Sequence, residues 1–314
     1  MGGAHTPTVP RPAVIALFGP TGVGKTAVAI ALAARLRALG ERPVAVSADA
    51  LQVYEGLEIL TGAAGAAERA QLEHRLLSFL PVDAGFSAGQ YAELAHAEID
   101  GLLGEGARPI VVGGTGLYLR AALTELSLRP PPPEGLRERW TAELERRGPQ
   151  ALHAILRARA PWAAEQIDPG DRQRIVRALE LHDAGELEPP SEESELWTDA
   201  VRHPTLLIGL TMEREQLYRR IDERVEEMVG AGAEQEVRRA AAAGASATAR
   251  KALGFEDLLA GDVEGMKRRT RNYARRQLTW MRKLAAVTVL DTTGRAPGDT
   301  AQAIVTRWLG APAT

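Results

Sequence analysis

The sequence contains no cysteine, and this absence excludes disulfides, thiolate metal sites and cysteine nucleophiles together. Histidine is also sparse, and the six histidines show no metal-ligand spacing. The apolar runs end well before the length that crosses a bilayer, and the N-terminus lacks the apolar centre of a signal peptide. We therefore expect a cytoplasmic protein that has no contact with membranes.

A strong charge imbalance is absent too. The formal net charge is −3 over 314 residues, which argues against a general polyanion binder but leaves room for local basic patches. Hydrophobic residues make up 45% of the chain, enough to bury a sizeable core in one large or two modest domains. Function must therefore be inferred from local motifs.

The strongest motif is a glycine-rich segment between a strand-like run at residues 13–18 and a helix-like run that begins near Lys25. Its spacing, Gly-x-x-x-x-Gly-Lys-Thr, is that of a phosphate-binding loop. Glycines let backbone N–H groups converge on an anion, the helix N-terminus adds positive potential, and the lysine adds a point charge. Thr26 would offer its hydroxyl to a magnesium ion. The predicted phosphate-binding residues are Gly19, Thr21, Gly22, Val23, Gly24, Lys25 and Thr26.

The flanking segments predict an α/β fold with a P-loop NTPase-like, mostly parallel sheet flanked by helices. A helix over residues 25–39 is followed by a second strand at 44–47, which is the start of such a sheet. Ser87 and Gln90 form a capping box that opens a helix running to about residue 103. Residues 62–67 predict a mobile loop. Further strands are expected at residues 110–112, 205–211 and 287–290.

Two of these strands end in candidate functional groups. Asp49 follows the second strand, and three glycines surround Thr115 after the strand at 110–112. Ligands of open α/β sheets bind at the carboxyl ends of the strands, so both segments are expected to face the phosphate loop. Asp49 is a candidate base or magnesium ligand, although an aspartate in this position also forms turns and helix caps. The glycines permit close backbone approach, but tight turns use the same residues.

The middle of the chain predicts an inserted all-helical lobe at residues 129–200. Four consecutive prolines at 130–133 form a stiff linker, and helical periodicity without strand-like runs follows. The catalytic core then comprises residues 13–128 and 201–314, and residues 1–12 are expected to be disordered. Several arginines cluster in the lobe. From the sequence, a basic surface that only contacts solvent and a basic surface that contacts RNA are equally good explanations of this cluster.

A basic helix is predicted at residues 267–283, with eight basic residues. On a helix, Tyr273, Gln277 and Trp280 share one face and several arginines line an adjacent face. Basic residues interleaved with aromatics suit a nucleic-acid backbone. The alternative is that the aromatics pack inward and the arginines are only solvated.

Together these motifs resemble those of the tRNA dimethylallyltransferases, the isopentenyltransferases that modify the adenosine beside the anticodon. The likeness covers nearly the whole chain in consistent order, which makes it far more specific than the phosphate loop alone. The matching segments are residues 19–26, residues 47–49 with Gln52 and Tyr54, residues 112–118, residues 171–180 and residues 271–280.

The resemblance implies that the loop holds the diphosphate of dimethylallyl diphosphate as a leaving group. The allyl group would move to N6 of the tRNA adenosine at position 37, with release of pyrophosphate. Asp49 would be the general base, and Thr115 would hydrogen-bond at the reacting centre. Lys25 and a Mg²⁺ ion held by Thr26 and Asp49 would stabilise the departing charge.

The resemblance also implies that the enzyme is a monomer whose lobe contacts the anticodon stem-loop. Backbone and side chains from four segments would bind the tRNA. These residues are Gln52, Tyr54, Gly114, Arg172, Gln173, Arg174, Arg177, Arg271, Arg275, Arg276 and Gln277.

The chain departs from the family pattern beside the catalytic aspartate. Ala50 replaces a usual hydroxyl residue, Leu51 a frequent arginine, and residues 61–64 lack a usual lysine. We expect altered donor affinity more than loss of activity. The alternatives are an ATP-dependent small-molecule kinase of the P-loop class, a non-catalytic RNA-binding relative and a prenyltransferase of free adenine nucleotides. Neither the kinase nor the free-nucleotide enzyme requires the lobe.

Overall fold

The computed structural model describes residues 11–126, 133, 135–189, 200–284 and 286–310. The chain divides into two compact units, residues 1–126 with 196–314 and residues 127–195. Of the predicted disorder at residues 1–12, residues 1–10 lie outside the described residues, as does the predicted proline linker at residues 130–132. The prediction is wrong for Pro12, whose carbonyl accepts hydrogen bonds from Arg108 and Trp308.

The first unit is built on a six-stranded sheet in which every pair of neighbouring strands is parallel. Their spatial order is β3-β2-β4-β1-β5-β6. The strands are β1 (Val14–Phe18), β2 (Pro43–Ser47), β3 (His74–Arg75), β4 (Arg108–Gly113), β5 (Thr205–Thr211) and β6 (Thr288–Asp291). The predicted strands and the α/β class are confirmed, and only the two-residue edge strand β3 was not predicted.

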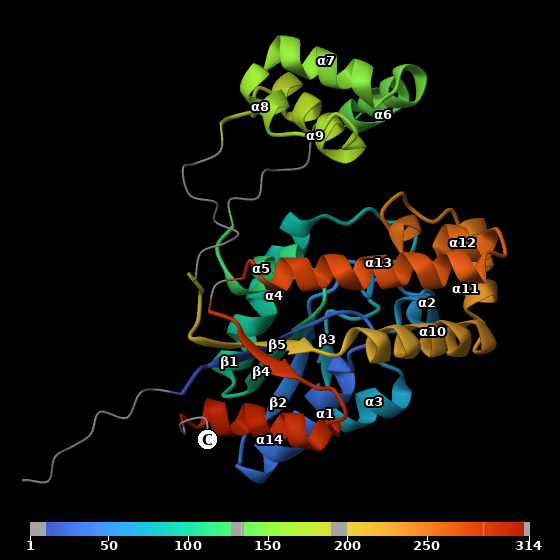
Figure 1. Cartoon of the computed structure of the whole chain (residues 1–314). Coiled ribbons are helices and arrows are strands. Elements are labelled where there is room, and N and C mark those ends of the chain that lie inside the picture. Colours follow the sequence, from blue (N-terminus) through green and yellow to red (C-terminus); the bar gives the residue numbers. More distant parts are fainter. Residues whose placement is uncertain (1–10, 127–132, 134, 190–199, 285, 311–314) are drawn as a thin grey trace, which may run out of the picture. The chain divides into compact units, whose positions relative to one another are not determined.

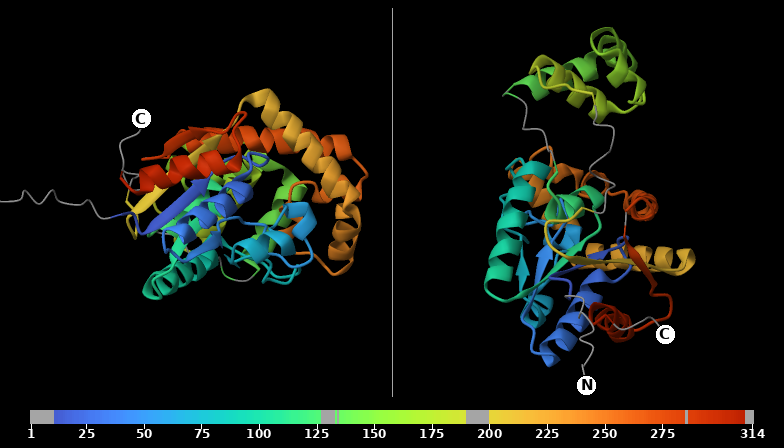
Figure 2. Two further views of the ribbon diagram at one scale, coloured as in Figure 1. Left: turned by 90° about the horizontal axis from the view of Figure 1, so that it is seen from below. Right: turned by 90° about the vertical axis from the view of Figure 1, so that its left-hand side faces the viewer.

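Helices and one short 3₁₀ turn complete this unit. They are α1 (Lys25–Ala38), α2 (Glu58–Thr61), α3 (Ala66–Gln71), α4 (Ala88–Gly104), α5 (Gly116–Leu123), α10 (Arg214–Gly230), α11 (Ala233–Ala242), η2 (Ala249–Lys251), α12 (Phe255–Leu259), α13 (Val263–Met281) and α14 (Pro297–Trp308). In Figure 1, α1 and α14 lie on one side of the sheet, and α4, α5 and α13 lie on the other. Helices α1 and α14 lie side by side (Figure 2).

Burial on both faces explains the apolar composition of the central strands. All five residues of β1 are buried, as expected for a parallel strand covered by helices on both sides. Ile15 and Leu17 point to one face, where they join Leu32, Leu36 and Trp308 in one hydrophobic cluster. The alternation of side chains along the strand sends Ala16 and Phe18 to the opposite face.

Local capping fixes where several helices begin. The Ser87 hydroxyl accepts the N–H of Gln90, and the Gln90 side chain accepts the N–H of Ser87, which confirms the predicted capping box of α4. The loop prediction at residues 62–67 is wrong at its end, because α3 begins at Ala66. The Glu68 carboxylate accepts the N–H of Gly65 at 2.9 Å and so starts this helix early.

The strand order brings four loops together at the carboxyl edge of the sheet. Because β4 lies between β2 and β1, and β5 lies beyond β1, the loops that follow these strands are neighbours. The ends of β1 and β4 are level, since Phe18 pairs with Gly113, whereas β5 continues two residues past Gly209, the partner of Phe18. Gly113 allows the closest approach, because a Cβ there would overlap the carbonyl oxygen of Ala48.

The second unit is a small helical domain with its own core. Its helices are α6 (Leu136–Arg147), α7 (Pro149–Arg159), α8 (Pro161–Glu165) and α9 (Arg172–Asp183). The helical periodicity predicted for this segment is confirmed by these helices. Trp140, Leu152, Leu156, Ile175 and Leu179 are buried at the centre. These side chains recur at helical spacing, which is the pattern that predicts helices packed around one core.

Replacement of Gly113 by alanine tests the close approach of β4 to the loop after β2. We expect Gly113→Ala to lower the free energy of unfolding by about 1–3 kcal/mol, because the new methyl group must displace backbone. Gly101→Ala is the matched control: a Cβ at this helical site meets open space, so the variant should gain about 0.5–1 kcal/mol. Chemical unfolding midpoints measure both changes, and equal effects at the two sites would contradict the packing argument.

Candidate active site

A cavity of about 870 Å³ opens at the carboxyl edge of the sheet, within the first unit. Its volume lies in the range of small-molecule sites. The loops after β1, β2 and β4 line it, together with α2, α10 and α13. Three residues predicted as catalytic, Lys25, Asp49 and Thr115, all line this cavity.

The phosphate loop has the backbone shape that its glycines predict. Gly22 and Gly24 have φ angles of 82° and 95°, in the left-handed region that favours glycine. Helix α1 begins immediately afterwards, so its unpaired N–H groups face the loop. The Lys25 ammonium donates to the carbonyl oxygens of Gly19 at 2.9 Å and Pro20 at 3.1 Å. The loop therefore holds its lysine in place.

The surroundings of Lys25 lower the pKa of its side chain. Burial lowers the pKa of Lys25 to about 8, while the negative charge of Asp49 acts to raise it and the positive charge of Arg224 lowers it further. A new negative charge in the cavity would favour the charged ammonium. The loop therefore gains positive charge when an anion binds.

Asp49 forms a turn and also faces the cavity, so the structure agrees with both roles that its position in the sequence suggested. Its Oδ1 accepts the N–H of Leu51 at 3.0 Å, which is a turn-forming contact. The carboxylate also faces the cavity, where its charge contributes to raising the pKa of Tyr91, Tyr118 and Tyr273, although burial is the larger cause for each. Asp49 is thus a cavity-facing acceptor held by its own loop.

Thr115 precedes α5 and contacts α13. Its Oγ1 lies 3.0 Å from the hydroxyl of Tyr273, and both side chains line the cavity. The guanidinium of Arg276 lies over the Tyr273 ring, 5.5 Å from its centre. The glycine-rich segment after β4 therefore meets the basic helix at the site.

Sequence reasoning missed two arginines on α10. Arg220 lies beside the loop, because a Cβ on Gly24 would be 3.4 Å from its Nη2. Arg224 donates to the Gly62 carbonyl at 3.4 Å, and burial lowers its pKa. Both line the cavity, and Arg224 lies against the segment that lacks the expected lysine. A signal existed, since both arginines lie next to Ile221 and Val225 on the apolar side of an amphipathic helix.

Glu236 on α11 supports one wall of the cavity and was also missed. Its carboxylate is 3% exposed and accepts the N–H groups of Ile59 at 3.0 Å and Leu60 at 2.7 Å. Burial raises the pKa of Glu236. The contact fixes the first turn of α2. The carbonyls of Thr61 and Gly62, where this helix ends, accept hydrogen bonds from the Gln52 amide.

Two residues predicted to contact tRNA are buried and bonded within the protein. Tyr54 is fully buried in a hydrophobic cluster, and its hydroxyl donates to the Ala84 carbonyl at 3.2 Å. Gln277 is 4% exposed, accepts the N–H of Thr21 at 2.8 Å and donates to the Gly114 carbonyl at 2.8 Å. In this structure these side chains support the site instead of presenting a surface to RNA.

The basic helix α13 divides its side chains between two directions. Tyr273 and Gln277 point to the site, and Trp280 packs against Gly116, as the inward-packing alternative expected. Arg275 and Arg276 are exposed. Arg271 instead pairs with Asp222 on α10, at 2.6 Å. Part of the basic helix is therefore structural, and part faces outward.

The arginines of the second unit are partly neutralised. Arg172 pairs with Glu145, Arg174 lies 3.4 Å from Asp171, and Arg177 lies 3.4 Å from Glu180. Glu180 is fully buried and also binds Arg137 at 2.8 Å. Gln173 is exposed on the same helix. Their contact with tRNA stays a prediction.

The sequence model of a protein family described as IPP transferase matches residues 52–284. The chain belongs to this family. The match covers α10 and α13, and the resemblance inferred from the motifs is confirmed.

Relatives of this IPP transferase support the same grouping. A tRNA dimethylallyltransferase of Symbiobacterium thermophilum is 38% identical over 292 residues, which cover 90% of each chain. One of Kineococcus radiotolerans is 41% identical over 289 residues, covering 88% of this chain and 89% of that relative. The crystal structure of a full-length tRNA isopentenylpyrophosphate transferase from Bacillus halodurans matches with a TM-score of 0.67 and 32% identity, over 95% of this chain and 96% of that chain.

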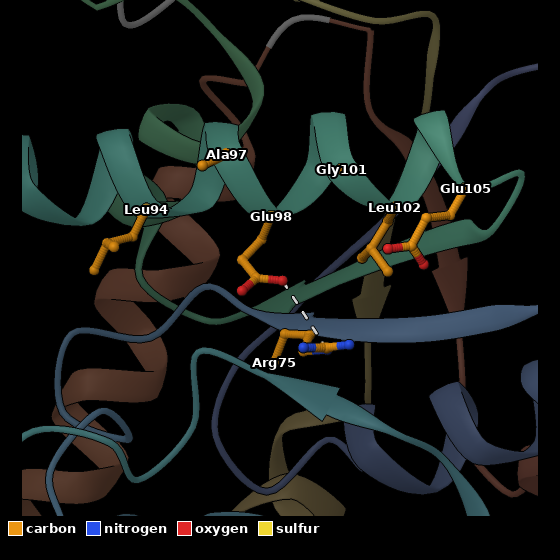
Figure 3. Close-up of a pocket in the computed structure, with 7 residues that line it drawn as sticks. All are labelled: Arg75, Leu94, Ala97, Glu98, Gly101, Leu102 and Glu105. Carbon is orange, nitrogen blue, oxygen red and sulfur yellow. Dashed lines mark ion pairs between the residues drawn. The ribbon is translucent and has the colours of Figure 1, made fainter.

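A second, smaller hollow of about 310 Å³ lies between β3 and α4 (Figure 3). Arg75 points from β3 toward Glu98 on α4, with Nε 4.0 Å from the carboxylate, and also pairs with Glu73 at 2.7 Å. The exposed Leu94 and the buried Leu102 border it. The opposing charges inside this hollow are already matched by one another.

The pKa of Lys25 predicts how diphosphate binding responds to pH. Below about pH 8, Lys25 is charged in the ligand-free protein. Above about pH 8, Lys25 is neutral in the ligand-free protein and must take up a proton when the diphosphate binds. We expect the affinity for dimethylallyl diphosphate to fall by up to about tenfold per pH unit above this point, since one pK unit is about 1.4 kcal/mol. Titration calorimetry without RNA measures this. Lys25→Met should bind more weakly and lose the pH dependence, and an equal slope in both proteins would contradict the assignment.

Proposed function

We propose that this chain transfers a dimethylallyl group from dimethylallyl diphosphate to N6 of the tRNA adenosine at position 37 and releases pyrophosphate. The proposal depends on one observation: the phosphate loop, the Asp49 carboxylate and the Thr115 hydroxyl line a single cavity at one edge of the sheet. The chain that has this cavity belongs to the IPP transferase family. The names of the relatives, tRNA dimethylallyltransferase, support the same reaction. They do not favour the kinase or the non-catalytic alternative.

The diphosphate would bind at the positive end of the cavity. Loop N–H groups, the N-terminus of α1 and Lys25 supply a phosphate cradle. Arg220 and Arg224 add two guanidinium groups from α10. Because Arg224 lies at Gly62, it supplies the positive charge that a lysine near residues 61–64 would have provided. This arrangement accounts for a functional donor site in spite of the sequence departures.

The reaction then needs little covalent help from the protein. The bond between the allylic carbon and the diphosphate oxygen breaks, its electron pair leaves with pyrophosphate, and a bond forms between adenine N6 and that carbon. Asp49 takes the proton released from N6. Stabilisation of the leaving charge by Lys25 and the arginines, together with positioning, supplies most of the rate.

A magnesium ion fits the donor set of the cavity. Magnesium is usually held by one or two carboxylates plus substrate phosphates, with water completing the shell. Thr26 and Asp49 both line the cavity and would hold such an ion together with the diphosphate. When bound, the ion would neutralise charge on the phosphate oxygens.

The RNA would be held by exposed basic side chains, among them Arg275 and Arg276 on α13, of which Arg276 borders the cavity. Single-stranded loops whose bases can be turned outward are the RNA targets that such sites use. The lobe helices would grip the adjacent stem. We propose that a monomer is active. No helix in the described part of the chain is long and apolar enough to cross a membrane.

The proposal is tested by incubating the protein with dimethylallyl diphosphate, magnesium and an unmodified tRNA that has adenosines at positions 36 to 38. Nucleoside mass analysis should detect the added prenyl mass on the adenosine at position 37. Free adenosine monophosphate serves as the control acceptor and should remain unmodified. Prenylation of the free nucleotide alone would support the adenine-nucleotide alternative.

Replacement of Asp49 by asparagine keeps the shape of the side chain but removes the base. We expect Asp49→Asn to lower kcat by about 10²–10⁴-fold, the usual contribution of general base catalysis. The amide oxygen of the new side chain can still accept the Leu51 N–H, so the loop should stay folded. Single-turnover rates at saturating tRNA measure the effect, and a rate within about threefold of wild type would exclude Asp49 as the base.

Arg224 is expected to bind the donor. Arg224→Met should weaken the affinity for dimethylallyl diphosphate by about 10- to 100-fold, because a hydrogen bond to a charged group contributes about 1.5–3 kcal/mol. Arg219→Met is the matched control, since Arg219 is exposed on the same helix and does not line the cavity. Equilibrium binding without RNA compares the two variants. Equal weakening in both would point to a general loss of positive charge instead of a specific contact.

A further inference from the structure

The orientation of the Gln277 amide is fixed by two backbone partners. The N–H of Thr21 can only donate and the carbonyl of Gly114 can only accept, so the amide oxygen faces the phosphate loop and the nitrogen faces the loop after β4. Gln277 and Tyr273 lie four residues apart on α13, and both side chains line the cavity.

The Tyr273 hydroxyl has one proton to donate. Burial and then the charge of Asp49 raise the pKa of Tyr273 to about 12, so the phenol keeps this proton at neutral pH. The partner 3.0 Å away is Thr115 Oγ1. A phenol is more acidic than an aliphatic hydroxyl, so it donates to threonine more readily than the reverse. The Thr115 proton is then the one that remains free to point into the cavity.

We propose that Tyr273 is a positioning residue that makes Thr115 a hydrogen-bond donor to the leaving oxygen of the allyl diphosphate. This inference rests on the proposed function. As the carbon–oxygen bond breaks, negative charge grows on that oxygen, and a donor already aimed at it stabilises the transition state more than the ground state. Thr115 keeps its proton throughout.

The test removes one hydroxyl. Tyr273→Phe keeps the ring and its contact with Arg276 but leaves Thr115 free to rotate. We expect kcat to fall about tenfold, the equivalent of one net hydrogen bond, while the Kd for dimethylallyl diphosphate stays within about twofold. Thr115→Val should lower kcat by about 100-fold. The double variant should be no slower than Thr115→Val, because Tyr273 acts through Thr115.

Tyr91→Phe is the matched control. Tyr91 is fully buried, its hydroxyl donates to the Ser47 carbonyl at 2.9 Å, and it does not line the cavity, so its removal should leave kcat unchanged. A Tyr273→Phe protein with wild-type kcat, effects that multiply in the double variant, or a change confined to the KM for tRNA would each overturn the inference. A wild type without any prenyl transfer rejects the proposed function and this inference together, whereas an active wild type with any of those outcomes rejects the inference alone.

Discussion

The pairing of β4 between β1 and β2 is the constraint on which the site depends. Parallel strands end at the same edge, so this order places the loops that carry Lys25, Asp49 and Thr115 beside one another although they are far apart in the sequence. The loops meet closely only because Gly113 has no side chain where the Ala48 carbonyl lies. The chemistry therefore depends on backbone packing before it depends on any catalytic side chain.

Charge in the cavity is balanced, and that balance suits an anionic ligand. Lys25, Arg220 and Arg224 lie near the phosphate loop. Burial lowers the pKa of Lys25 and the pKa of Arg224. Asp49 and Glu68 partly compensate Arg224. A bound diphosphate would take over that compensation and restore the full charge of Lys25. The same groups that make the free site electrostatically costly would thus provide binding energy for a diphosphate.

The strands, the phosphate loop, Asp49 and Thr115 could be predicted because each is encoded locally, by an apolar run followed by its own loop. Arg224 and Glu236 could not, since they come from helices more than 150 residues beyond Gly62 and Ile59, which they contact. Periodicity shows that Ile221 faces a core but not which cavity the neighbouring arginine borders. Tyr54 illustrates the opposite error, because a residue within a recognised motif turned out to be buried.

Helix α13 resolves the two interpretations of its basic, aromatic sequence. The alternatives were an RNA-binding face or inward-packed aromatics, and the helix has a side suited to each. Its inward side contacts the phosphate loop through Gln277 and Thr115 through Tyr273. Arg275 and Arg276, between these two residues in the sequence, are exposed, and Arg276 also borders the cavity. An RNA docked on the outer side would contact the same helix that lines the cavity with Tyr273 and Gln277. A double role of this kind would account for the mixed composition of the segment.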